Sequence, residues 1–184
     1  SSQTGTAKYG ERVYGYAMQD KALEIGYYVD GSTADPSRLT QSRIITDVDN
    51  TITFYYVAEP VEINYRIVVG GAVGTNLSGC YVTPSLNSAN SHAGTVSGSV
   101  PHIADGYYFD GWYTDAACTV PVPADWVGAE NRLTPKAVDG LIRQATYYAK
   151  ASPCSLTIIK KGEVQSNETF LFRVTGGSES KQID

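Results

Sequence analysis

Apolar and polar residues alternate with a period of two along much of this chain. The clearest case is 62–69, where Ile63, Tyr65, Ile67 and Val69 are expected to face inward and the polar residues at 62, 64 and 66 outward. Because successive side chains of a strand point to opposite faces of its sheet, this pattern predicts strands with one buried face. We expect strands at 51–57, 62–69, 80–84, 106–114, 145–150, 155–160 and 169–175.

Helical periodicity is scarce. Residues 11–24 have room for a turn or two of helix, and 124–127 for a short one. The long polar stretch 85–99 is expected to be a loop. Residues 47–50 predict a β-turn, because Asp and Asn favour turns, with calcium ligation by their oxygens as the alternative. The pattern therefore predicts a mostly β protein with little helix.

Two prolines lie between predicted strands, in the segments 58–60 and 151–154. Proline removes a hydrogen-bond donor from a β-ladder and favours a break there. We therefore expect tandem small β-modules joined by short linkers, with segments 1–58, 59–151 and 152–184. A chain of 184 residues is long enough for two or three small domains.

Charge and composition narrow the classes of partner. The net charge is −5, whereas nucleic acids and anionic membranes favour basic surfaces, so we expect neither partner. No apolar run approaches the ~20 residues that span a bilayer, so we expect no membrane insertion. Fourteen Tyr stand against four Phe, and Tyr covers apolar surface while keeping its hydroxyl in water, which suits thin β-modules.

Aromatic side chains are the candidates for a binding surface. Adjacent tyrosines occur at 27–28, 55–56, 107–108 and 147–148. Period two places one ring of each pair on each face of a sheet, so we expect one exposed ring per pair. The candidate binding residues are Tyr28, Tyr108, Tyr148 and Trp126. For Trp126 we expect a cap over a sheet edge and for Trp112 a place in the core, with sugar stacking as the alternative for both.

The residues that could support catalysis are Cys80, Cys118, Cys154, His92 and His102. A Cys–His nucleophile requires an imidazole within hydrogen-bond reach of a thiol, and neither a nucleophile motif nor a zinc-type spacing surrounds any of them. We expect surface histidines and half-buried cysteines, with a Cys80–Cys118 disulfide as an open alternative. No catalytic residue, metal or cofactor is expected.

The run 106–118, GYYFDGWYTDAAC, joins an aromatic strand, an Asp-Gly step, a Trp-Tyr pair and a polar turn. Together with LTP at 133–135 and ATYYAK at 145–150, in matching order and spacing, it resembles the internalin-type B-repeat. The resemblance covers nearly all of 59–151. It implies a central β-grasp-like sheet with little or no helix, in a module of Gram-positive surface proteins.

The flanking segments resemble other surface modules. Residues 1–58 resemble the latter part of a mucin-binding-type repeat through GYYV, TQSRI and ITFYYV, without the first strand of such repeats. Residues 152–184 resemble the opening of a collagen-adhesin B-type (pilin-like) domain through LTIIKK and ETFLFRVTG. We expect this last segment to be truncated, because an isolated hairpin is marginal in water.

These resemblances imply a fragment of an extracellular adhesin or stalk on the cell surface or cell wall of a Gram-positive bacterium. Its modules would act as spacers that present an adhesive part, and not as an enzyme. The alternative is direct binding of a host mucin, glycan or extracellular-matrix protein through exposed tyrosines and the 85–99 segment. The predicted hairpin 156–174 would leave exposed strand edges, so we also expect strand-mediated self-association.

Overall fold

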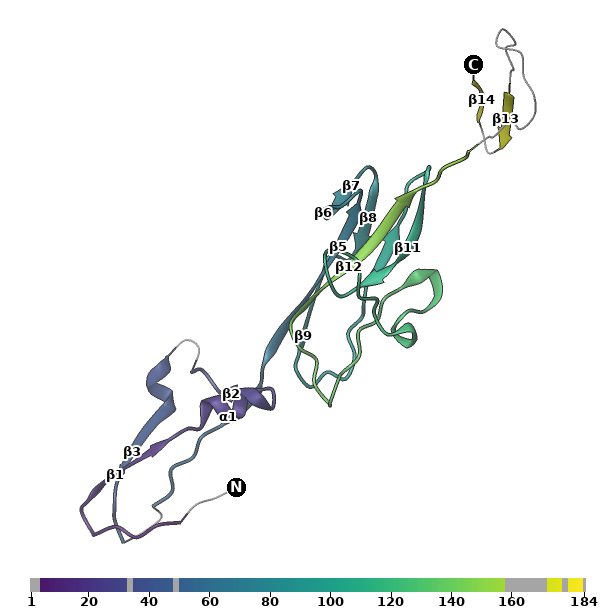
Figure 1. The fold of residues 1–184 in the computed structure, drawn as a ribbon. Helices are drawn as coiled ribbons and strands as arrows, with labels where there is room; N and C mark the ends of the chain where they lie inside the picture. The colour runs from purple at the N-terminus through teal and green to yellow at the C-terminus, as the bar shows by residue number, and fades with distance from the viewer. Residues whose placement is uncertain (1–3, 33–34, 48–49, 158–171, 177–178, 184) are drawn as a thin grey trace. The chain divides into compact units, whose positions relative to one another are not determined.

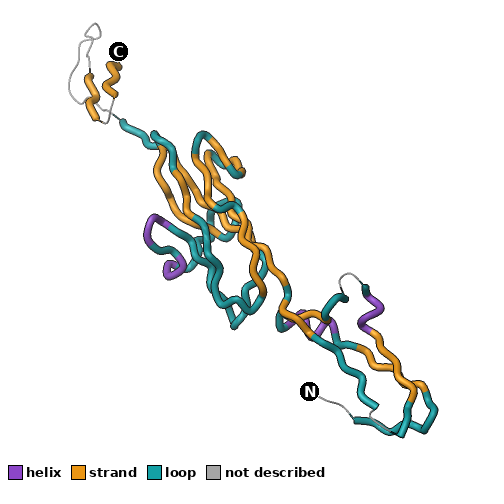
Figure 2. Tube along the Cα trace, turned by 180° about the vertical axis from the view of Figure 1, so that it is seen from behind, coloured by secondary structure: helices purple, strands orange, loops and turns teal. Residues whose placement is uncertain are grey.

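The computed structural model describes residues 4–32, 35–47, 50–157, 172–176 and 179–183 (Figure 1). The chain divides into two compact units, one ending at Cys154 and the other beginning at Ser155. Strands and loops dominate the described residues (Figure 2), so the expected mostly β fold is confirmed. No helix in these ranges is long and apolar enough to cross a membrane.

The N-terminal segment, up to residue 58, is built from two small antiparallel strand pairs. β1 pairs with β3, and β2 pairs with β4. Pro36 and the Asp35 side chain, which accepts a hydrogen bond from Ser37 N, start a short 3-10 helix. The elements are β1 (Arg12–Tyr16), α1 (Gln19–Glu24), β2 (Tyr27–Val29), η1 (Pro36–Leu39), β3 (Thr40–Ile44) and β4 (Tyr56–Ala58).

Several predictions for this segment need correction. α1 falls within the predicted helical stretch, but the first part of that stretch is β1, a strand that the pattern missed. The strand predicted at 51–57 shrinks to β4, because side chains of β3 hold the backbone before it. Gln41 Nε2 donates to the Thr53 carbonyl at 2.9 Å, and Arg43 Nη1 to the Thr51 carbonyl at 3.4 Å. Both rings of the 55–56 pair are exposed, against the expectation of one exposed ring per pair.

A mixed five-stranded sheet forms the centre of the first unit (Figure 1). Its order is β11-β12-β5, with β6 and β9 sharing the far edge of β5. β5 and β12, the first and last strands of the sheet, are parallel neighbours, and the other pairs are antiparallel. The strands are β5 (Pro60–Val69), β6 (Ala72–Gly74), β9 (Leu86–Asn90), β11 (Tyr107–Tyr113) and β12 (Ala145–Pro153). This order fits the expected β-grasp-like sheet.

A smaller sheet and two 3-10 turns complete the central part of this unit. The small sheet has the order β10-β8-β7 and is antiparallel. Cys80 and Val82 of β8 join the buried cluster formed by the inner face of the large sheet. The elements are β7 (Asn76–Leu77), β8 (Cys80–Thr83), β10 (Val100–His102), η2 (Ala124–Trp126) and η3 (Ala129–Asn131).

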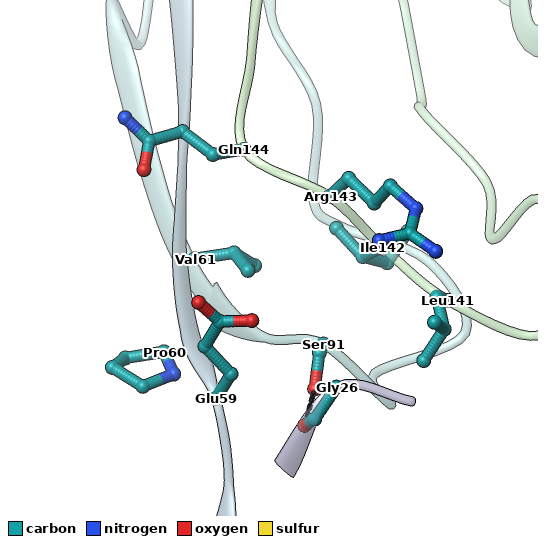
Figure 3. A pocket seen from close by; sticks show the side chains of 9 residues that line it. All are labelled: Gly26, Glu59, Pro60, Val61, Ser91, Leu141, Ile142, Arg143 and Gln144. Atoms are coloured by element: carbon teal, nitrogen blue, oxygen red, sulfur yellow. Dashed lines mark hydrogen bonds between the residues drawn. The ribbon is translucent and has the colours of Figure 1, made fainter. Parts of the chain in front are cut away.

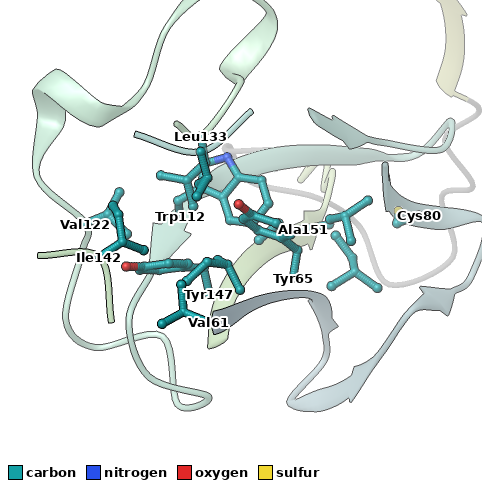
Figure 4. Close-up of a cluster of buried hydrophobic side chains, with 14 residues drawn as sticks. Val61, Tyr65, Cys80, Trp112, Val122, Leu133, Ile142, Tyr147 and Ala151 are labelled. Carbon is teal, nitrogen blue, oxygen red and sulfur yellow. The ribbon is translucent and has the colours of Figure 1, made fainter. Parts of the chain in front are cut away.

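The core lies against the inner face of β5, where Ile63, Tyr65 and Ile67 are at most 1% exposed (Figure 4). Trp112 stands edge-on to Tyr65, with ring centroids 6.0 Å apart, and its Nε1 donates to the Asn131 carbonyl at 2.7 Å. Burial raises the pKa of the Tyr65 hydroxyl, which is satisfied by donating to Asn87 Oδ1 at 2.8 Å. The core placement of Trp112 is therefore confirmed, and so is the alternation from Glu62 to Ile67; it breaks at the strand's end, where Val68 is buried and Val69 half-buried.

The stretch 85–99, predicted to be a loop, contains strand β9. Its polar residues hid the strand, because Asn87 occupies a position that faces the core. The Asn87 side chain is satisfied there, since its Oδ1 accepts from both Tyr65 Oη and Gly98 N. A half-buried amide whose oxygen accepts two hydrogen bonds can replace an apolar residue on the inner face of a strand.

The strand predicted at 145–150 runs on to Pro153, so 151–153, predicted as part of a linker, belong to β12. Ala151 is 1% exposed and joins the core. Proline is tolerated at this strand end because few ladder donors follow it. The boundary predicted at 58–60 stays a prediction.

The second unit contains one described strand pair, β13 (Phe172–Gly176) antiparallel to β14 (Glu179–Ile183). β13 falls within the predicted strand 169–175, whereas β14 was not predicted. Residues 155–157, the first half of the strand predicted at 155–160, are described and are not in a strand. Residues 158–160 and most of the predicted hairpin 156–174 lie outside the described residues. The self-association expected from that hairpin therefore stays a prediction.

Candidate functional site

The outer face of the central sheet gathers three tyrosines. Alternation along β12 sends Tyr147, Ala149 and Ala151 into the core, so Tyr148 points to the opposite face. Tyr113 is its antiparallel register partner on β11, and both rings are half-buried. Tyr108, which is 51% exposed, lies farther along the same face of β11. We call the set Tyr108, Tyr113, Tyr148, Arg66, Lys150 and Asp110 the tyrosine face.

A β-bulge in β11 explains how this strand supplies side chains to both the tyrosine face and the core. The register shifts between Phe109 and Gly111, leaving Asp110 as the extra residue. Phe109 and Trp112 are three positions apart and would face opposite sides of a regular strand. The bulge places both in the core, where their rings meet edge to face. Asp110 is thereby directed toward β12.

Asp110 forms the ion pair of the tyrosine face. Its Oδ2 lies 2.6 Å from Lys150 Nζ and accepts from Ser152 Oγ at 3.2 Å. The Lys150 ammonium lowers the pKa of Asp110, and in return Asp110 raises the pKa of Lys150. Lys150 Nζ also lies 6.0 Å from the Tyr113 ring centroid. The pair therefore holds the lysine over an aromatic ring.

Arg66, on the parallel strand β5, is the register partner of Tyr148. Its Nη1 donates to the Tyr65 carbonyl at 2.9 Å and lies 3.4 Å from the Ser85 carbonyl. No carboxylate among the described residues forms an ion pair with it. A guanidinium has five donors, so Arg66 keeps hydrogen-bonding capacity and charge beside the Tyr148 ring. This arrangement can stack on a sugar or a planar group and pair with an anion.

The structure brings together two of the four predicted binding residues. Tyr108 and Tyr148 share the outer face, separated along it by about 13 Å, the rise of four strand residues. Trp126 packs on the core side, edge-on to Tyr147 with centroids 6.1 Å apart, as expected of a cap. Tyr28 lies on β2 in the N-terminal segment and is half-buried.

The expectation of one exposed ring per pair is met at 107–108, where Tyr108 is exposed and Tyr107 half-buried. It is not met at 147–148, where Tyr147 is buried and Tyr148 half-buried, or at 27–28, where both rings are half-buried. Sequence reasoning missed Tyr113 and Lys150 as members of the site. The outward position of Arg66 followed from alternation, but its neighbour Tyr148 could not be deduced, because periodicity does not reveal which strands pair.

A second polar constellation joins the N-terminal segment to the central part, and we call it the junction. The Gly26 carbonyl accepts from Glu59 N at 2.8 Å and from Ser91 Oγ at 2.5 Å. Ser91 is 2% exposed, and its own N–H donates to the Glu59 carbonyl at 2.8 Å. The side chain of Ser91 thus bridges two segments that lie 65 residues apart.

His92 adds a second contact to the junction. Its Nε2 lies 3.0 Å from the Ile25 carbonyl, which can only accept a hydrogen bond, and its ring lies 4.3 Å from that of Tyr27. Gly26 has a φ of +74°, and a Cβ there would come within 2.7 Å of Ser91 Oγ. Only glycine allows this close approach.

A hollow of about 200 Å³ lies beside the junction, lined by Glu59, Arg143, Gln144 and apolar neighbours (Figure 3). A shallower one of about 120 Å³ includes Trp126 and Tyr147 in its lining. Both are smaller than the roughly 300–1,000 Å³ of typical small-molecule sites. They fit water or a small polar group better than a cofactor.

The cysteines are all free thiols, so the Cys80–Cys118 disulfide does not form. Cys80 is fully buried, Cys118 is partly buried and Cys154 is exposed. Burial raises the pKa of the Cys118 thiol, which disfavours the reactive thiolate. His92 and His102 are exposed; the ring of His102 stacks on Tyr81, and the ring of His92 lies tilted against Tyr27.

The resemblances to surface-protein modules stay predictions, which rest on the sequence motifs given above. Comparison of the chain with protein-family models, with curated proteins and with solved structures finds no match.

Proposed function

We propose that the chain is a fragment of a bacterial cell-surface adhesin or stalk whose β-modules space and present an adhesive part. The parallel pairing of β5 with β12 carries this proposal. Because the first and last strands run in the same direction, the chain enters the central sheet at one end and leaves it at the other. A strand of ten residues spans about 33 Å, so each such module adds length.

The junction supports the same function. Only Glu59 separates β4 from β5, and the backbone of Glu59 is hydrogen-bonded to Gly26 and Ser91. A flexible Gly/Ser connection would behave as a random coil. The bonded junction instead gives the next module a direction. The placement on a Gram-positive wall rests on the resemblance of 106–118 and its flanking motifs.

The proposal is tested by displaying a reporter binding domain on a Gram-positive cell through this chain. Capture of ligand-coated particles is compared with capture through a Gly/Ser linker of 184 residues, the length of the chain. A spacer predicts greater capture when a polymer layer covers the cell, because a folded array holds the reporter away from the wall. Equal capture through the flexible linker would contradict the proposal.

Direct recognition of a host mucin glycan or host protein is a second candidate, and the tyrosine face favours it. Arg66 forms no ion pair with a described carboxylate and lies beside the half-buried Tyr148, with Tyr113 next to that ring and the exposed Tyr108 farther along the same face. Aromatic rings beside a guanidinium are the kind of surface that binds sugars or peptides. Binding of the full chain to immobilised mucins, glycans and extracellular-matrix proteins tests this function. Saturable binding that is lost in Tyr148→Thr or Arg66→Gln would support it. Tyr81→Thr is the matched control, since Tyr81 is an exposed tyrosine of the smaller sheet.

A further inference from the structure

The parallel pairing of β5 with β12 runs in register over seven residue pairs, from Ala145 with Ile63 to Ala151 with Val69. These two strands are also where the chain enters and leaves the sheet. Tension along the chain therefore pulls β5 by its N-terminal end and β12 by its C-terminal end. Because the strands are parallel, the two pulls slide one strand past the other.

From this geometry we infer a mechanical function: the β5–β12 pair is a clamp that resists force applied along the chain. The inter-strand hydrogen bonds run across the strand direction, so sliding strains all of the pairs together. No single pair can break ahead of the rest, as it would if the strands were peeled apart. The inference rests on the proposed spacer function, because a wall-anchored spacer transmits the pull on its adhesive part.

The neighbours of β5 strengthen the clamp. On its other edge, β9 adds five antiparallel pairs at the end where the force enters. Ile63, Tyr65 and Ile67 are locked in the core, and the Tyr65 hydroxyl is hydrogen-bonded to Asn87 of β9. A slip by one residue would turn these side chains outward, and a slip by two would move each into a site shaped for another. Sliding β5 therefore disrupts the core as well as the ladder.

For comparison, the same sheet has a direction of pulling in which it should resist force only weakly. β11 and β12 are antiparallel, and their ends meet where Cys154 N donates to the Gly106 carbonyl at 2.8 Å. A pull between these ends acts along the hydrogen bonds and opens the pairs one after another, from Tyr107 and Pro153 inward. The clamp thus predicts a resistance that depends on the direction of pulling.

Force spectroscopy on the full chain with two cysteine attachment points tests the inference. Cys154, which is exposed, is the shared attachment point. Glu62→Cys supplies the shearing direction and Asp105→Cys the peeling direction, and both positions are exposed. Both variants carry Cys118→Asn, because residue 118 has a φ of +54°, a conformation that Asn tolerates. The buried Cys80 remains.

We expect the unfolding force between residues 62 and 154 to be several-fold higher than that between 105 and 154 at the same pulling rate. Equal forces, or a lower force in the shearing direction, would overturn the clamp. That outcome is separable from failure of the spacer function, because the display comparison uses no defined pulling direction. Conversely, equal capture through a Gly/Ser linker would leave the difference between the two forces unchanged.

Discussion

Trp112 and Tyr108 are aromatic residues of the same strand. Trp112 is 2% exposed and packs in the core, whereas Tyr108 is 51% exposed on the outer face. We expect Trp112→Ala to lower the free energy of unfolding by about 3–5 kcal/mol, since it removes a large core side chain. Tyr108→Thr keeps a strand-forming residue on the outer face, and we expect a change within about 0.5 kcal/mol. Urea denaturation of both variants measures the difference. Similar losses of unfolding free energy in the two variants would mean that Tyr108 is packed rather than exposed to solvent.

Asp115 holds the turn after β11 through its carboxylate. Its oxygens accept from Val120 N at 2.7 Å, Thr119 N at 3.0 Å and Thr119 Oγ at 2.9 Å. These bonds, with that from Val120 first, lower the pKa of Asp115. A carboxyl with a lowered folded-state pKa stabilises the fold above its unfolded pKa of about 3.9, and this contribution is lost as the pH falls further.

We therefore expect Asp115→Asn to flatten the loss of thermal stability below about pH 4. The midpoint of thermal unfolding is followed across that range, with Asp105→Asn, at an exposed loop position, as the control. An unchanged acid dependence in Asp115→Asn would show that the hydrogen bonds of this carboxylate do not contribute to stability.

The cysteines differ in access. Cys154 is exposed, Cys118 is partly buried with a raised thiol pKa, and Cys80 is fully buried. Alkylation at neutral pH is expected to modify Cys154 first and Cys118 more slowly, because the thiolate is the nucleophile. Cys80 is expected to react only in denaturant. Mass spectrometry of the native chain gives the order, and early modification of Cys80 would contradict the buried position of its side chain.

At the scale of elements, two glycines in the 91–99 region carry a matched prediction. Gly94 and Gly98 have φ values of +76° and +78°, but a Cβ meets nothing at Gly94 and would lie 1.9 Å from the Leu133 carbonyl oxygen at Gly98. Gly94→Ala is expected to cost about 1–2 kcal/mol for the left-handed backbone alone. Gly98→Ala is expected to cost more, because the bridge between Ser99 and Leu133 must open.

Denaturation midpoints of the two variants measure this difference. Equal losses would contradict the close packing of Gly98 against Leu133.

Elements with an apolar face could be predicted from the sequence, and those without one could not. β5 alternates from Glu62 to Ile67, so its buried side was evident. β9 was missed because Asn87 takes a core position that only its hydrogen bonds to Tyr65 and Gly98 make favourable. The bulge at Asp110 was also hidden, although the Asp-Gly step marks its position.

At the scale of the whole molecule, the sequence pattern did not predict which strands pair with one another. Alternation shows which side of β5 is buried, but not that β12 lies parallel beside it. The β-grasp-like expectation came from the resemblance of the central segment. Pro60 was the only residue of the junction that the sequence marked. The hydrogen bonds of the junction are made mainly by backbone groups of Gly26 and Glu59 and by Ser91, and backbone bonds leave no pattern in the sequence.

The junction carries the prediction that bears on the spacer function. In Gly26→Ala the new Cβ would meet Ser91 Oγ at 2.7 Å and Leu141 at 2.8 Å, so the two segments must separate. Gly10→Ala is the matched control, with a φ of +81° and nothing within 4 Å of the new Cβ. We expect Gly26→Ala alone to loosen the junction.

The most direct test is the distance distribution between spin labels on either side of the junction, measured by pulsed electron paramagnetic resonance. Labels at Tyr14→Cys and Asp105→Cys, both exposed positions, are placed in a chain that carries Cys118→Asn and Cys154→Ser. A spacer predicts one narrow distance peak, kept in Gly10→Ala and broadened in Gly26→Ala. A broad distribution in the parent chain, unchanged by Gly26→Ala, would contradict a fixed junction and with it the spacer function.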